Sequence, residues 1–141
     1  PTGERNVYTL VPRDAVLCLA GSDDARLVQL AAVLAAGSRA VWPADGQGLA
    51  ALLPPAVRQA ISVVPDWTAP GVHFDAVLHQ GDDAALLQLQ QRIAARPGPI
   101  VGITRTTGGG DALPLERLFM ERALSVNTAA AGGNASLMTI A

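Results

Sequence analysis

The strongest structural signal in this chain is the segment AVLCLAGSDDARLVQLAAVLAAG, residues 15–37. Its first six residues form a continuous apolar run of strand length, which is typical of a strand buried on both faces. A helical pattern follows in residues 22–36, and Gly37 is placed to end it. The apolar residues that share one face of this helix are Leu27, Leu30, Ala31 and Leu34. The segment therefore predicts a buried strand followed by a helix that packs against it.

The same alternation of strand and helix continues along the chain. Further strand-length apolar runs lie at residues 39–42, 61–64, 74–79 and 100–104. Helical patterns lie at residues 46–59, where Pro54 and Pro55 break the helix, and at residues 82–95. Alternating buried strands and helices predict the α/β class. We expect a Rossmann-like, open, mostly parallel sheet flanked by helices, followed by an extended C-terminal tail of β type.

Composition and charge exclude several classes of protein. Of the 141 residues 50% are hydrophobic but only 4% are aromatic, so we expect one core rich in Ala, Val and Leu. The net charge of −2 gives no electrostatic reason to bind nucleic acid or an anionic membrane. The chain starts at Pro1 without a leader and has no apolar span of ~20 residues. We therefore expect a piece of a longer cytoplasmic polypeptide that does not insert into a membrane.

The turn after the first strand bears on nucleotide binding. A dinucleotide-binding fold carries G-x-G-x-x-G at this turn, because the pyrophosphate must approach bare backbone at the start of the helix. Here the turn is AGSDDA, residues 20–25, in which Asp23 and Asp24 would occupy the positive end of the helix dipole and repel phosphate. Asp82 and Asp83 start the last helix in the same way, and capping explains them. We therefore expect a Rossmann-like domain that does not take NAD in its crevice.

No residue of the chain stands out as catalytic or metal-binding. Cys18 lies inside the apolar first strand, where an inert core thiol is expected rather than a nucleophile. His73 and His79 have no cysteine nearby and make a poor metal site. Trp42 and Trp67 are expected to pack in the core rather than to stack on bases. The sequence thus predicts no catalytic residue, no cofactor-binding residue and no metal ligand in this segment.

The C-terminal segment SVNTAAAGGNASLMTI, residues 125–140, has an unusual composition. It is too apolar for a solvated tail and too rich in glycine for a helix. Residues 129–133 carry no bulky side chain, so another backbone can approach closely, as when a strand is added to a sheet edge. The alternative is that the segment ends the sheet of this domain itself.

This segment resembles the C-terminal motif of the bacterial proline utilization A (PutA) proteins, bifunctional enzymes that oxidise proline to glutamate. The resemblance extends over nearly the whole chain, to the region that follows the aldehyde dehydrogenase module in the longer members. The other segments that carry it are residues 2–6, 12–13, 16–20, 29–33, 41–43, 74–77, 115–118 and 121–122. Two places depart from the family pattern, namely the Gly/Thr loop from Thr104 to Asp111 and Ala141, where the family has Gly.

The resemblance implies a noncatalytic role within a larger enzyme. Residues 15–123 would form a Rossmann-like domain of the aldehyde dehydrogenase superfamily, after a linker at 1–14 and before a tail at 124–141. The tail would pack on the aldehyde dehydrogenase module and close the cavity through which the intermediate passes. FAD would serve the proline dehydrogenase, and NAD the glutamate-semialdehyde dehydrogenase, in other domains of the longer protein. The residues expected at this interdomain or oligomer interface are Ser125, Asn127, Thr128, Gly132, Gly133, Asn134, Ser136 and Met138.

The partner and two rival functions stay open at this point. The aldehyde dehydrogenase module could belong to the same or to a neighbouring PutA chain, and tail exchange would give a homodimer. The longer protein could also associate peripherally with the inner membrane. One rival function is an independent nucleotide- or metabolite-binding module that uses the crevice of the sheet. The other is an enzyme fragment with a site built from Cys18 and a histidine.

Overall fold

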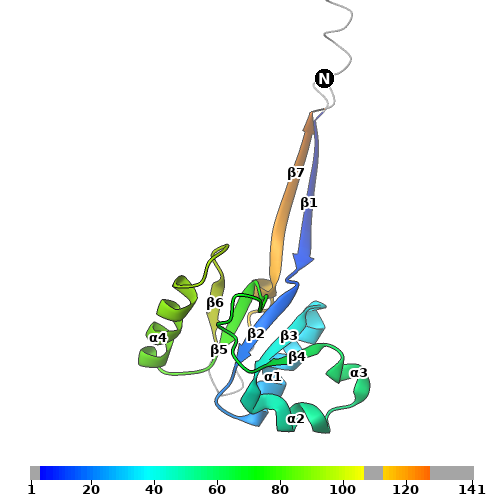
Figure 1. The fold of residues 1–141 in the computed structure, drawn as a ribbon. Coiled ribbons are helices and arrows are strands. Elements are labelled where there is room, and N and C mark those ends of the chain that lie inside the picture. The colour runs from blue at the N-terminus through cyan, green and yellow to red at the C-terminus, as the bar shows by residue number, and fades with distance from the viewer. Residues whose placement is uncertain (1–3, 107–112, 128–141) are drawn as a thin grey trace, which may run out of the picture. The chain divides into compact units, whose positions relative to one another are not determined.

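The structure is a computed structural model that describes residues 4–106 and 113–127. The chain separates into two compact units. The larger unit runs from Pro12 to Phe119, and the smaller unit joins the segments before Pro12 and after Phe119. Figure 1 labels the helices and strands of both units.

The larger unit is built on a five-stranded parallel sheet. Its strands are β2 (Ala15–Leu19), β3 (Arg39–Pro43), β4 (Ile61–Val64), β5 (Ala76–His79) and β6 (Gly102–Arg105), in the spatial order β4-β3-β2-β5-β6. β2 is the central strand, and its Leu17 pairs with Val41 of β3 on one side and with Val77 of β5 on the other. All four neighbouring pairs are parallel. The predicted Rossmann-like sheet is confirmed.

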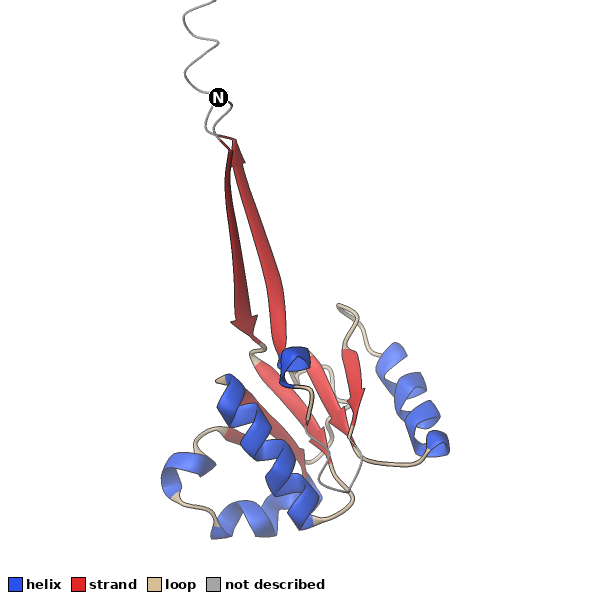
Figure 2. Ribbon diagram, turned by 180° about the vertical axis from the view of Figure 1, so that it is seen from behind, coloured by secondary structure: helices blue, strands red, loops and turns tan. Residues whose placement is uncertain are grey.

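Helices connect the strands and cover both faces of the sheet. They are α1 (Asp23–Ala36) after β2, then η1 (Ala44–Gly46), α2 (Gln47–Leu52) and α3 (Pro55–Arg58) after β3, α4 (Asp83–Ala94) after β5, and η2 (Leu115–Leu118) after β6. The predicted break is confirmed, because α2 ends before Pro54 and α3 begins at Pro55. Figures 1 and 2 together show α1, α2 and α3 on one face of the sheet and α4 on the other.

The side chains of β2 divide the core into two layers. Successive residues of a strand point to opposite faces. Val16 and Cys18 belong to the layer that contains α1, and Leu17 belongs to the layer that contains Leu89 of α4. Because both layers are apolar, β2 is buried on both faces, which explains its continuous apolar sequence.

The buried face of α1 differs from the predicted one. Leu30 is buried as expected, but Leu27 and Ala31 are exposed and Leu34 is only half-buried. The residues that α1 buries are Arg26, Gln29, Leu30, Ala32, Val33 and Ala36. The prediction was wrong because this helix carries apolar residues nearly all round, so periodicity alone does not determine which face meets the sheet.

The smaller unit contains a two-stranded ribbon. Strand β1 (Glu4–Pro12) pairs with β7 (Phe119–Asn127), and Figure 1 draws the two arrows in opposite directions. The Thr9 hydroxyl donates a hydrogen bond of 3.4 Å to the carbonyl oxygen of Arg122 across the pair. The sequence predicts a linker at residues 1–14, whereas residues 4–12 form a strand. The domain boundaries themselves stay a prediction.

Candidate functional site

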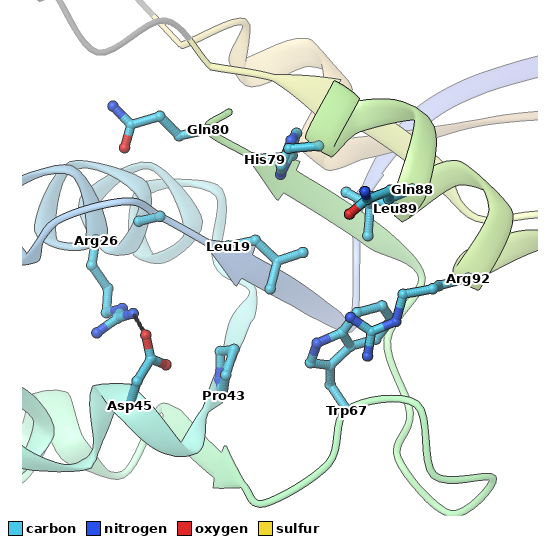
Figure 3. Close-up of a pocket in the computed structure, with 12 residues that line it drawn as sticks. Leu19, Arg26, Pro43, Asp45, Trp67, His79, Gln80, Gln88, Leu89 and Arg92 are labelled. Atoms are coloured by element: carbon cyan, nitrogen blue, oxygen red, sulfur yellow. Dashed lines mark hydrogen bonds and ion pairs between the residues drawn. The ribbon is translucent and has the colours of Figure 1, made fainter. Parts of the chain in front are cut away.

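A crevice lies at the carboxyl edge of the parallel sheet. The chain leaves β2 for α1 on one face and leaves β5 for α4 on the other, so the two connections diverge between neighbouring strands. Ligands of open α/β sheets bind at such a switch point. A cavity of about 330 Å³ lies here, and Figure 3 shows the side chains that line it.

The cavity has apolar walls and a few polar groups. Its large apolar side chains are Leu19, Pro43, Trp67 and Leu89, which come from β2, β3, the segment after β4, and α4. One stripe of α4 faces it, with residues spaced three or four apart. The residues of this stripe are Ala85, Gln88, Leu89 and Arg92. The other polar residues of the lining are Arg26, Asp45, His79 and Gln80.

Helices α1 and α4, which begin at this edge, are each capped by a side chain. Ser22 Oγ accepts a hydrogen bond of 3.3 Å from the Ala25 N–H, and Asp82 Oδ1 accepts one of 2.8 Å from the Ala85 N–H. Asp23 and Asp24 lie in the first turn of α1, as Asp83 does in α4. The predicted placement of these acids at helix starts is confirmed, and the positive ends of both helices face carboxylates.

We expect the 141-residue chain not to bind NAD. The backbone N–H groups that would hold a pyrophosphate are capped or lie beside carboxylates, so its charges would be repelled. Titration calorimetry should give a Kd for NAD weaker than about 100 μM, which corresponds to about 5.5 kcal/mol. A tighter Kd would show that the crevice accommodates a pyrophosphate in spite of Asp23 and Asp24.

His79 ends β5, lines the cavity and is only 6% exposed. Burial lowers the pKa of its ring, and the positive charge of Arg105 acts in the same direction, so the imidazole is neutral near pH 7. Within the described part of the chain, neither ring nitrogen has a hydrogen-bond partner. Gly81 makes room for the ring, because a Cβ at that position would lie 2.7 Å from His79 Nε2.

Arg26 is a buried cation whose charge is already balanced. Its Nη2 lies 2.6 Å from Asp45 Oδ2, and its Nη1 lies 3.5 Å from Asp23 Oδ1. Its guanidinium carbon lies 5.7 Å from the centroid of the Trp42 ring. Arg26 therefore adds no unpaired charge to the cavity.

Two arginines organise the segment between β4 and β5. Arg96 donates hydrogen bonds to the carbonyl oxygens of Trp67 and Val72, and its guanidinium carbon lies 4.2 Å from the centroid of the Phe74 ring. The guanidinium carbon of Arg92 lies 4.2 Å from the centroid of the Trp67 ring. Arg92 has no hydrogen bond or ion pair to another described residue. The guanidinium of Arg92 therefore lies against an aromatic ring, and no described residue accepts a hydrogen bond from it.

Cys18 lies in the core, as its apolar surroundings in the sequence predict. Burial raises the pKa of its thiol to about 12, although the Trp42 indole and the Arg26 charge act in the opposite direction. A thiol with this pKa is almost entirely protonated at neutral pH and is a weak nucleophile. Across residues 4–106 and 113–127, no group of three or more His, Cys, Asp or Glu side chains could hold a metal ion.

The predicted interface residues lie at the end of the chain. Ser125 and Asn127 belong to β7. The other six, Thr128, Gly132, Gly133, Asn134, Ser136 and Met138, lie outside the described residues, as does most of the Thr104 to Asp111 loop. The crevice of the sheet was predicted as a rival binding site, but its lining residues Arg92 and Gln88 were not, because a cavity depends on contacts between distant segments.

Comparison with known proteins identifies the relatives of this chain. No family model matches it. It is 50% identical to the bifunctional protein PutA of Escherichia coli over 142 residues, which cover 99% of this chain, and 41% identical to that of Rhizobium meliloti over 147 residues, also 99% of this chain. The chain matches a C-terminal part of PutA. It spans only 11% and 12% of the length of these two PutA proteins.

Solved PutA structures contain the same fold. A Bradyrhizobium japonicum PutA variant aligns with a TM-score of 0.57 at 24% identity, covering 77% of this chain and 13% of that one. A PutA structure with proline bound in remote sites aligns with a TM-score of 0.55 at 25% identity and the same coverage. The described part of the present chain has no helix that is both long and apolar enough to cross a membrane.

Proposed function

We propose that this chain is the noncatalytic C-terminal part of a bifunctional PutA enzyme that converts proline to glutamate. The observation that carries the proposal is its identity of 41–51% to four PutA proteins over 94–99% of its length. In this role the tail, residues 124–141, packs on the aldehyde dehydrogenase module of the same or a neighbouring chain. It closes the cavity between the two catalytic sites, and FAD and NAD are bound by other domains.

The features of the ribbon formed by β1 and β7 favour an interaction with a partner. A two-stranded sheet is marginally stable by itself, and among the described residues β1 and β7 form a sheet of two strands. Large apolar side chains are exposed on both strands, namely Tyr8, Leu10, Leu124 and Val126. Exposed apolar residues are typical of an interaction surface where they gather on one face of an element. Because β7 includes the first residues of the tail, a partner that covers this ribbon would also lie next to the tail.

The composition of the tail supports close packing on that partner. Gly132 and Gly133 lack side chains that would keep two backbones apart. The carboxamide of Asn134 and the hydroxyls of Thr128 and Ser136 can pair with backbone groups of a receiving surface. The apolar residues that follow, Leu137, Met138 and Ile140, would be costly to leave in water.

Hydrogen exchange of residues 128–141 tests the packing of the tail. In an intact PutA that carries this chain, we expect these amides to exchange at least about tenfold more slowly than in the monomeric 141-residue chain, because packing protects them from water. Helix α1 provides the control, since it belongs to the sheet domain and should exchange alike in both proteins. Equal exchange of the tail in the two proteins would contradict its packing on the aldehyde dehydrogenase module.

A further inference from the structure

We propose that another cavity of the sheet domain, beside the edge strand β6, binds the phosphate group of a small phosphate monoester through Arg13 and Arg117. The cavity has a volume of about 480 Å³. All the residues that line it belong to the larger unit of the chain, Pro12–Phe119. The site therefore goes beyond the proposed role of the tail and does not depend on it.

The cavity arises where small residues lie on one face of the sheet edge. Successive residues of a strand point to opposite faces, and Ile103 of β6 packs in the core layer that contains α4. Gly102 and Thr104 therefore face the opposite side, where α1 and η2 lie. Ala76 of β5, which pairs with Gly102, is also part of the cavity wall. A Cβ at Gly102 would meet no atom within 4 Å, so the space beside this residue is open.

Arg13 and Arg117 lie together at this cavity without a countercharge among the described residues. The backbone N–H of Arg13 donates a hydrogen bond of 2.9 Å to the carbonyl oxygen of Leu118, the neighbour of Arg117. Neither guanidinium has an ion pair or a hydrogen bond to another described residue. Arg117 is exposed, and in the half-buried Arg13 only Nε is enclosed, so its two Nη groups are accessible. A partly desolvated guanidinium without a counterion is unfavourable, and a bound anion would relieve this cost.

The other charged groups at the cavity leave an excess of positive charge. Arg105, at the end of β6, also lines the cavity, and its Nη1 pairs with Asp83. Glu116 is the carboxylate of the lining, and it is exposed. The carboxylate of Asp75 lies outside the lining and accepts hydrogen bonds from two backbone N–H groups near the start of β2. After Arg105 is balanced by Asp83, two arginines face one lining carboxylate.

A phosphate monoester suits this arrangement better than a carboxylate does. One guanidinium can occupy both oxygens of a carboxylate, whereas a phosphate group has three acceptor oxygens that two guanidiniums can share. The hydroxyl of Thr104 lines the cavity and can donate to a phosphate oxygen as well. The volume of about 480 Å³ lies in the lower part of the range of about 300–1,000 Å³ for ligand pockets, which favours a small molecule.

Titration of the ¹⁵N-labelled 141-residue chain, followed by NMR, tests the site. The probe is methyl phosphate, which is largely a dianion at about pH 7.5. Acetate is the carboxylate counterpart, and sodium chloride at the same ionic strength controls for screening. We expect methyl phosphate to give saturable shifts of the Gly102, Thr104 and Arg117 amides, with a Kd of about 1 mM or lower. Acetate should bind at least about tenfold more weakly, and chloride should give no saturable shift.

Arginine variants test which charges hold the phosphate group. Arg13→Gln and Arg117→Gln should each weaken the binding of methyl phosphate by about tenfold or more. Arg58→Gln is the matched control, at an exposed arginine of α3 outside the cavity, and it should leave the Kd unchanged. Unfolding midpoints equal to that of the unchanged chain would show that the variants fold.

A glycine variant tests the position of the site independently of charge. Gly102→Val places a side chain in the open space of the cavity and should abolish the saturable shifts. Gly71→Val is its control, because a Cβ there also meets no atom within 4 Å but Gly71 lies outside the cavity. If Gly102→Val lowers the unfolding midpoint, the arginine variants decide alone.

The site is overturned if methyl phosphate gives no saturable shift, or if acetate or chloride binds equally well. It is also overturned if Arg58→Gln weakens binding as much as the two cavity variants, or if a folded Gly102→Val chain binds normally. PutA activity is not a readout here, so the result is independent of the role of the tail.

Discussion

Deleting residues 125–141 from a PutA protein that carries this chain is expected to lower its aldehyde dehydrogenase kcat/KM by about tenfold or more. Proline dehydrogenase activity should stay nearly intact. A lid of backbone and small side chains shapes one active site and excludes water from it, and small displacements of such elements have large kinetic effects. The flavin site would not be touched by the tail. Separate steady-state assays of the two activities, with glutamate semialdehyde and with proline, measure both effects.

A second, shorter deletion separates the tail from the ribbon. Residues 125–127 are the last three of β7, so the longer deletion also shortens a paired strand. Deleting only residues 128–141 leaves β7 complete and removes six of the eight predicted interface residues. We expect the shorter deletion to have nearly the full effect on aldehyde dehydrogenase activity. If only the longer deletion lowers this activity, the cause is damage to the ribbon rather than loss of the lid.

Replacing Trp42 by alanine is expected to lower the free energy of unfolding of the 141-residue chain by about 3–5 kcal/mol. Trp42 is fully buried in β3, within the core layer that contains α1. The Arg26 guanidinium lies over the Trp42 ring. A Cβ at Gly46 would lie 2.9 Å from Cε3 of this ring, so the ring is tightly enclosed. A change of this size is a large fraction of the stability of a small domain. Urea denaturation followed by circular dichroism measures it.

Leu52→Ala is the matched control for the Trp42 variant. Leu52 ends α2 and is 83% exposed, so its truncation should change the free energy of unfolding by less than about 0.5 kcal/mol. A cost below about 1 kcal/mol for Trp42→Ala would show that the two core layers are not packed as described.

The parallel sheet was predictable because each strand carries its own local signal. β2, β3 and β5 are short apolar runs buried on both faces, and each is followed within a few residues by a helix start or a turn. The helix caps Ser22 and Asp82 are also predictable from the sequence, because each capping hydrogen bond joins residues only three positions apart. Local chemistry of this kind needs no knowledge of the tertiary structure.

The ribbon and the buried face of α1 depend on contacts that local patterns do not contain. Strand β1 pairs with a strand at the other end of the chain, and Thr9 and Arg122, which share a hydrogen bond, are 113 residues apart. Its sequence, ERNVYTLVP, alternates only weakly between polar and apolar residues. Helix α1 carries apolar residues on several faces, so its packing against the sheet determines which face is buried. In the structure Arg26 and Gln29 are buried and Leu27 is exposed.

The candidate sites were predictable to different degrees. The tail stood out by composition, since a run of small residues and two glycines is unusual at the end of an apolar segment. The crevice of the sheet was predicted only as a rival binding site without lining residues, because the cavity is formed only when Arg96 anchors the segment after β4 and brings Trp67 next to Arg92. A single histidine in a buried strand likewise gives no sign in the sequence that its ring nitrogens will lack partners.

The time course of the coupled reaction tests the closing role of the tail most directly. In an intact PutA that carries this chain, conversion of proline to glutamate should reach its steady rate without a lag, because the intermediate stays in a closed cavity. After deletion of residues 128–141, we expect a measurable lag and escape of the intermediate into solution, where a trapping reagent detects it. A truncated protein with no lag, no trapped intermediate and unchanged aldehyde dehydrogenase kinetics would contradict the proposed role.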